Sequence, residues 1–117
     1  MPPEEADRAS LVDMLAFARE VAAFIDGRKR ADLDRDVAFL RAVERSLELV
    51  GECARRISPG TRERYATIPW QKIVGMRNVI AHEYGRVNFD EIWKTAQHDT
   101  PSLVSALEEI VAALPPP

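Results

Sequence analysis

Residues 40–57 read LRAVERSLELVGECARRI, and this stretch decides the fold. Its apolar residues recur at alternating spacings of three and four, which places one set on a single helical face: Leu40, Val43, Leu47, Val50, Ala54 and Ile57. This near-heptad stripe suits antiparallel packing inside a bundle or across a dimer. With Asp32 or Asp34 as its cap and Ser58 near its end, we expect the longest helix of the chain here.

The sequence on either side of this stretch also predicts helices. Before it, apolar residues at helical spacing predict a helix from Leu11 to a stop at Gly27. After it, Pro59 and Gly60 are expected to end the long helix, because proline cannot continue the hydrogen-bond ladder and glycine accepts the turn conformation. A loop or short helix over residues 61–67 is expected to follow.

Three further helices are predicted in the second half of the chain. One begins at Trp70 and is expected to stop at Gly85. Asn88 with Glu91 resembles a capping box and predicts the start of a short helix. Thr100-Pro101 predicts the start of the last one. Since no segment alternates with the period of a strand, the fold class is all-α, an antiparallel bundle of four or five helices.

The composition fits one ordinary globular domain. The chain has 117 residues, of which 46% are hydrophobic and 30% charged, enough to build a single core. We expect one helical domain over residues 1–117, with flexible ends at 1–7 and 115–117. A net charge of -3 argues against a protein that coats nucleic acid through bulk electrostatics, so any contact with RNA must be local.

The cellular setting is predicted from what the sequence lacks. Cys53 is the only cysteine, which excludes an intrachain disulfide and a cysteine zinc cluster and fits a reducing compartment. The first residues lack the pattern of a signal peptide, and no apolar run approaches the ~20 residues that cross a bilayer. We expect a cytoplasmic protein without a membrane partner.

Residues 77–84 read RNVIAHEY and carry the candidate chemistry. By itself an arginine five residues before a histidine is usually a solvated surface pair. His82, however, is of the residue type that takes and gives a proton near neutral pH. Arg77 can hold a phosphate and stabilise the charge on its oxygens. The two suffice for attack of a ribose 2′-hydroxyl on the adjacent phosphate, without a metal or cofactor.

Helix geometry constrains how these residues can act together. A separation of five places Arg77 and His82 about 140° apart around an ideal helix, whereas Asn78 and His82 are neighbours one turn apart. One helix alone therefore aims the pair poorly. Our hypothesis is a composite cleft, built where two copies of this helix meet across a two-fold axis.

Several further elements stand in a characteristic order: Gly51-Glu52 in the long helix, then Ile68-Pro69-Trp70, Gly75-Met76-Arg77-Asn78, His82-Glu83-Tyr84, Val87, Ile92-Trp93 and Pro101. In this order and spacing the sequence resembles the HepT-like branch of the HEPN-domain proteins, the toxin partners of minimal nucleotidyltransferases in prokaryotic toxin–antitoxin modules. The resemblance covers most of the chain. Cys53 stands where this family commonly has alanine, and Glu83 where it often has aspartate.

The resemblance implies a function and a set of partners. It implies a homodimeric, metal-independent ribonuclease toxin of a type VII module that cuts RNA, for example tRNA, with Arg77, His82 and Asn78 as the catalytic residues. It also implies a cognate nucleotidyltransferase antitoxin that silences the toxin by transferring AMP to Tyr84. A nucleotide beside the cleft would block RNA and cancel the positive field of Arg77.

Two other functions fit the same residues. A non-catalytic helical subunit could bind a nucleotidyltransferase or a nucleotide through Arg77 and His82, and it would also bind phosphate. A purely structural dimerisation module would need neither side chain. The full motif favours the ribonuclease.

The remaining polar and aromatic residues have simpler interpretations. Trp70 and Trp93 are expected to be core anchors rather than platforms for stacking bases, and His98 a surface residue near the break between the last two helices. Glu52 would orient Arg77 if their helices pack together. A group of basic residues is expected to form solvated faces rather than a phosphate-binding stripe: Arg28, Lys29, Arg30, Arg55, Arg56, Arg62 and Arg64.

Overall fold

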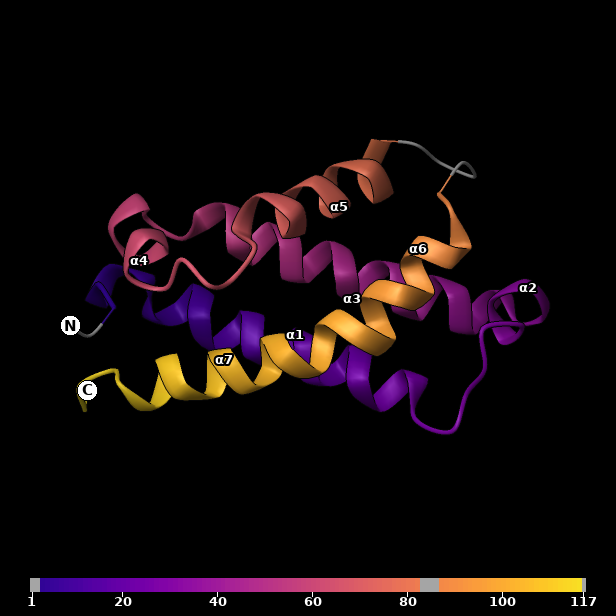
Figure 1. The fold of residues 1–117 in the computed structure, drawn as a ribbon, viewed down its shortest axis with the longest axis horizontal. Helices are drawn as coiled ribbons and strands as arrows, with labels where there is room; N and C mark the ends of the chain where they lie inside the picture. The colour runs from indigo at the N-terminus through magenta and orange to yellow at the C-terminus, as the bar shows by residue number, and fades with distance from the viewer. Residues whose placement is uncertain (1–2, 83–86, 117) are drawn as a thin grey trace.

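Helix α3 (Val37–Arg56) is the centre of the computed structural model, which describes residues 3–82 and 87–116. Helices α1 (Arg8–Ile25) and α5 (Trp70–His82) pack on its two sides, and α7 (Thr100–Ala112) packs on α1. Neighbouring helices run in opposite directions (Figure 1). In the described part of the chain there is no strand, so the predicted all-α antiparallel bundle is confirmed.

Short helices connect the long ones. They are the 3-10 turn η1 (Glu5–Asp7), α2 (Asp32–Arg35), α4 (Pro59–Arg64), α6 (Phe89–Lys94) and the π-helical turn η2 (Thr95–Asp99). None of the helices in residues 3–82 and 87–116 combines the length and the apolar character needed to span a bilayer.

The predicted start of the long helix is wrong. Asp36 has an extended backbone and separates α2 from α3, and its side chain caps α3 by accepting a hydrogen bond of 3.0 Å from the backbone N–H of Phe39. Asp32, one of the two expected caps, instead accepts from the N–H of Lys29. The helix therefore begins at Val37, because the residue that accepts from a free N–H at its start is Asp36, two residues after Asp34 and four after Asp32.

The long helix ends just before Pro59, as predicted, but Pro59 and Gly60 do not form the expected turn. They lie in the first turn of α4, where proline is tolerated, and Ser58 caps this helix. Arg62 caps the end of α3, because its guanidinium donates to the carbonyl oxygens of Ala54, Arg55 and Ile57 at 2.7–3.0 Å. These are among the carbonyls that a helix end leaves without partners.

The last two helices begin where the sequence predicts. Asn88 caps α6 by accepting from the N–H groups of Asp90 and Glu91, and α7 starts at Thr100. The expected break between them is absent, since η2 joins α6 to α7 and places His98 on an exposed turn of the π-helix.

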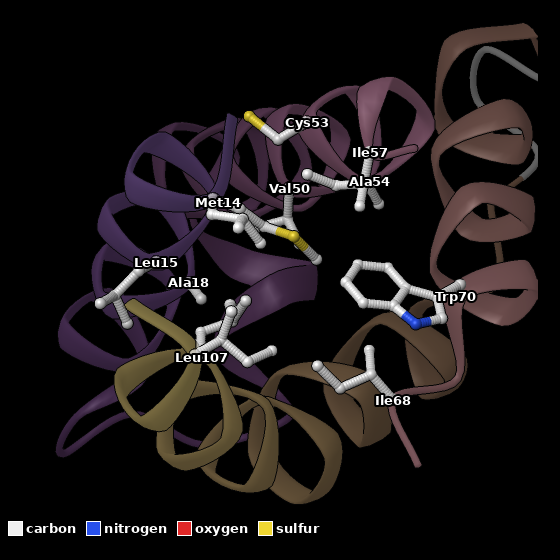
Figure 2. Packing of buried hydrophobic residues seen from close by; sticks show 12 residues of the cluster. Met14, Leu15, Ala18, Val50, Cys53, Ala54, Ile57, Ile68, Trp70 and Leu107 are labelled. Atoms are coloured by element: carbon white, nitrogen blue, oxygen red, sulfur yellow. The ribbon is translucent and has the colours of Figure 1, made fainter. Parts of the chain in front are cut away.

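Two clusters of buried apolar side chains hold the helices together. The first joins α1, α3 and α7 around Trp70, whose indole is 6% exposed and donates to the carbonyl of Tyr65 (Figure 2). The second joins α1, α2, α3 and α6 and includes Ile80 of α5, with Trp93 packed against it. The interpretation of Trp70 as a core anchor is confirmed, and Trp93 is a partly buried neighbour of the core.

The start of the chain is attached to the junction of α3 and α4 by Asp7. This carboxylate is 4% exposed and accepts hydrogen bonds from the N–H and hydroxyl of Ser58 and the hydroxyl of Thr61, at 2.6–3.0 Å. Burial alone would raise the pKa of Asp7, but these hydrogen bonds outweigh it and the pKa is lowered. Asp7 is the last residue of the segment 1–7 that we expect to be flexible. For the residues before Asp7, flexibility stays a prediction.

The anchor predicts a dependence of stability on Asp7 and on pH. Asp7→Asn should lower the free energy of unfolding near neutral pH by about 2 kcal/mol, because the hydrogen bonds would lose their charged acceptor. Since the folded-state pKa is lowered, the stabilisation is present above the unfolded pKa of about 3.9 and is lost as pH falls through the folded value.

Urea denaturation at several pH values would measure this effect. The curves of the native protein and Asp7→Asn should converge in acid, while Asp13→Asn, on the exposed side of α1, should follow the native protein throughout. A constant difference between native and Asp7→Asn at every pH would contradict the role given to the charge.

Candidate functional site

The motif helix α5 lies along α3, with its buried side chains directed to the core. Trp70 and Ile80 near its two ends are buried, and Ile73 and Met76 are half-buried between them. Trp70 packs with the carboxyl end of α3 and Ile80 with its amino end, so the two helices run antiparallel (Figure 1).

Gly51 of α3 allows α5 to come close at the position of Arg77. A Cβ atom on Gly51 would overlap the Cβ of Arg77 and lie 2.9 Å from its Cγ and 3.0 Å from the carbonyl oxygen of Ile73. Only a residue without a side chain fits between the two helices here. The Gly51-Glu52 element of the sequence is therefore the place where the two helices meet.

The close approach brings Arg77 to Glu52. The Nη2 atom of Arg77 lies 3.0 Å from Oε2 of Glu52, and its Nη1 donates to Oδ1 of Asn78 at 3.0 Å. The Arg77 side chain is 17% exposed, and its Nε is buried without a hydrogen-bond partner. The expected contact between Glu52 and Arg77 is present, and it holds the guanidinium in one orientation.

Glu52 also contacts two further arginines. Its Oε1 lies 2.8 Å from Nη2 of Arg55 and 3.5 Å from Nη2 of Arg56. The pKa of Glu52 is lowered, first by the hydrogen bond from Arg55 and then by the charges of Arg55, Arg77 and Arg56, which together outweigh its burial. The carboxylate is thus charged at neutral pH.

His82 and Asn78 lie on the exposed side of α5. Both side chains are exposed and are one helical turn apart, while Arg77 is directed into the contact with α3. Within the described residues, no hydrogen bond or ion pair joins Arg77 to His82. The structure thus brings Arg77 together with Asn78 and Glu52, and leaves His82 at the end of α5. Tyr84, the predicted modification site, lies outside the described residues.

A cavity lies on another side of α5. It has a volume of about 430 Å³ between α5 and α7, and Ile73, Met76 and Leu103 are among its apolar walls. An ion pair of 2.9 Å between Lys72 and Asp99 lies at its edge. Since Arg77, Asn78 and His82 do not line it, the motif belongs to the surface of α5 rather than to this cavity.

Most of the basic residues that could have formed a phosphate-binding stripe contact other protein groups instead. Arg28 lies over the ring of Phe39 and pairs with Asp36, Arg30 pairs with Asp34 and Asp90, and Arg62 caps α3. These contacts favour the interpretation as structural and solvated charges. Arg55 and Arg56 differ because they share Glu52 with the motif arginine.

Comparison with known proteins identifies relatives over most of the chain. The family model described as "Ribonuclease HepT-like" matches residues 14–110. The chain is 30% identical to a protein named "Putative RNase" from Methanocaldococcus jannaschii, over 96% of this chain and 97% of the relative.

Two other relatives have similar names. A "Putative RNase" of Caldanaerobacter subterraneus subsp. tengcongensis is 36% identical over 74% of this chain and 78% of its own length. A "Probable ribonuclease HepT" of Thermococcus cleftensis is 35% identical over 59% and 63%. No solved structure matches the chain.

The contact at Gly51 predicts the effect of adding one methyl group. Gly51→Ala should destabilise the fold by about 2 kcal/mol, because α5 must move away from α3 to remove the overlap. The same substitution at Gly75, where a Cβ meets nothing within 4 Å, should not lower the melting temperature. Thermal unfolding followed by circular dichroism would measure both, and equal melting temperatures for the two variants would disprove the close approach.

Proposed function

Because this chain belongs to the ribonuclease HepT-like family, we propose that it is an endoribonuclease whose chemistry depends on Arg77 and His82. The observation that carries the proposal is the fixed position of Arg77, which Glu52 and Asn78 hold beside an exposed helix face that ends in His82. A preoriented guanidinium stabilises developing negative charge without first having to reorganise.

The proposed reaction is an internal transfer at a phosphodiester. The ribose 2′-oxygen attacks phosphorus, the bond from phosphorus to the 5′-oxygen breaks, and the products are a 2′,3′-cyclic phosphate and a 5′-hydroxyl. One proton leaves the 2′-hydroxyl and one is added to the 5′-oxygen, and His82 serves as the base or the acid in these transfers. Arg77 binds the non-bridging oxygens, with Asn78 supporting its orientation. The residues require no metal.

The cleft is proposed to be completed by a second copy of the chain. Arg77 faces α3, whereas His82 and Asn78 face outward, so one α5 does not present the arginine and histidine to one phosphate. The exposed residues of α5 include only one formal charge and form an open surface: Gln71, Lys72, Gly75, Asn78, Val79 and His82. Val79 is 37% exposed, and Gly75 has open space beside it. Pairing two such faces would cover Val79 and bring two copies of the motif together.

The biological role that we propose is that of a cytoplasmic toxin controlled by a nucleotidyltransferase antitoxin. Tyr84 follows His82 by two residues. Its hydroxyl oxygen would attack the α-phosphate of ATP on the antitoxin, forming a bond to AMP and releasing pyrophosphate. The added nucleotide would stand beside His82 with a negative phosphate, and would exclude RNA by bulk and by charge. This proposal accounts for a tyrosine so close to the reacting histidine.

Cleavage of RNA in excess EDTA is the first test. The native protein should cut total tRNA and leave cyclic phosphate ends, while Arg77→Ala and His82→Ala should each lose at least about 100-fold in rate. His98→Ala is the matched control, because His98 is the other histidine of the chain and is also exposed. It should cut like the native protein.

Other results would change the assignment. Intact RNA in every sample, with folded protein that carries no AMP on Tyr84, would favour the non-catalytic subunit that binds a nucleotidyltransferase. Cleavage that stops with EDTA and returns with a divalent cation would disprove the metal-independent mechanism.

The dimer is tested by placing a charge on the exposed face of α5. Val79→Arg should shift the protein from dimer to monomer in sedimentation velocity and abolish cleavage, because two like charges would meet across the two-fold axis. Val12→Arg, at a valine of α1 that is 44% exposed, should remain dimeric and active. An active monomeric native protein would rule out the composite cleft.

A further inference from the structure

Three arginines from two helices meet at one carboxylate. Oε1 of Glu52 contacts Arg55 and Arg56 of α3, and Oε2 contacts Arg77 of α5. In these contacts one negative charge faces three positive charges, so two positive charges remain uncompensated at this point of the surface. An excess of this kind attracts anions.

The excess of positive charge is local, because each of the neighbouring arginines Arg41 and Arg45 of α3 pairs with its own glutamate. Arg41 pairs with Glu44, and Arg45 pairs with Glu48, each three residues further along the helix. The exposed surface of α3 thus alternates in charge from residue 41 to residue 48 and becomes positive only around Glu52.

The two outer arginines are accessible, unlike Arg77. The side chains of Arg55 and Arg56 are 55% and 64% exposed, against 17% for Arg77. Each uses one Nη atom to contact Glu52, and in the described part of the chain neither has another protein partner. Since a guanidinium carries five N–H donors, most of the donors of Arg55 and Arg56 are available to a ligand.

The order of these groups along the surface matches a strand of nucleic acid. Because α5 runs antiparallel to α3, Arg55 and Arg56 lie toward the Trp70 end of α5 and His82 lies at the other end, with Arg77 between them. Arg55 and Arg77 touch opposite oxygens of the same carboxylate, so their guanidiniums are close enough to hold consecutive phosphates.

We propose that Arg55 and Arg56 form a subsite for the phosphate next to the one that is cut, on a single RNA strand that leaves the composite cleft over Arg77 and runs toward the carboxyl end of α3. This inference rests on the proposed function and extends it. The ligand is the phosphodiester backbone, which arginine contacts position without reading sequence. The strand is single because in-line attack by the 2′-hydroxyl requires a linkage that can leave the A-form geometry.

Glu52 has a separate part as a positioning residue. It compensates one of the three charges and orients Arg77 through the pair at 3.0 Å. Removing its charge should therefore have opposite effects on two quantities. The affinity for RNA should increase, because the local positive charge grows, and kcat should fall, because Arg77 loses its anchor.

Binding of RNA that cannot be cut tests the subsite without requiring activity. A fluorescent single-stranded oligonucleotide with every 2′-oxygen methylated lacks the nucleophile, and its affinity is measured by anisotropy over a range of salt concentrations. Arg55→Ala/Arg56→Ala should bind at least about tenfold more weakly, and the slope of log K against log salt should fall by about 0.7, the value for one lost phosphate contact on a single strand. Arg41→Ala/Arg45→Ala, on the same helix, should change neither quantity.

Cleavage kinetics of an unmodified strand complete the test. The loss in Arg55→Ala/Arg56→Ala should appear in KM more than in kcat, whereas Glu52→Gln should bind the methylated strand more tightly and turn over more slowly. Circular dichroism would verify that each variant is folded.

The subsite and the proposed function fail in different ways. Unchanged affinity and salt slope in Arg55→Ala/Arg56→Ala, or no binding of the methylated strand by the native protein, would overturn the subsite even if RNA is cut. Binding with the expected salt dependence but no cleavage of any RNA would overturn the ribonuclease and leave the subsite standing.

Discussion

The contact between α3 and α5 depends on a missing side chain. At Gly51 the two helices come closer than any Cβ would permit, and the carbonyl of Ile73 and the Cβ of Arg77 occupy the space. This approach determines where Arg77 stands, and it brings its guanidinium within 3.0 Å of Glu52, the residue after the glycine. Two adjacent residues of α3 thus have different roles. Gly51 leaves room for α5, and Glu52 supplies the charge that pairs with Arg77. The burial of Arg77 and its place beside the arginines that share Glu52 follow from this contact.

The helices could be predicted from the sequence because apolar periodicity reports which residues face a core. Their ends could not always be predicted, because a cap is one residue among several plausible candidates. Asp32, Asp34 and Asp36 are all competent caps, and Asp36 is used because its extended backbone turns the chain into α3. Pro59 fits the end of one helix as well as the first turn of the next, and the carbonyls that Arg62 satisfies lie beyond the reach of any local pattern.

Some features of the candidate site could likewise be predicted from the sequence, and others could not. The angular separation of Arg77 from His82 follows from helix geometry, and the structure keeps them on different sides of α5. The contact of Glu52 with Arg77 depends on which helices are neighbours, so from the sequence it was only a conditional hypothesis. The sharing of Glu52 by Arg55 and Arg56 was not foreseen, because in sequence these residues look like ordinary members of a solvated charged face. The only available signal was two adjacent arginines one turn after a glutamate.

The position of α5 at the edge of the bundle has a consequence for its motions. Extensive packing joins it to α3, while the cavity separates it from α7 on one side and solvent covers its other side. An element held mainly by one neighbour separates from the fold at a lower free-energy cost than one enclosed on all sides. The amide hydrogens of the motif helix should therefore be less protected from exchange with solvent than those of α3, and a molecule that covers its open face should increase their protection. The reacting groups are thus carried by a helix whose stability depends on what covers its open face.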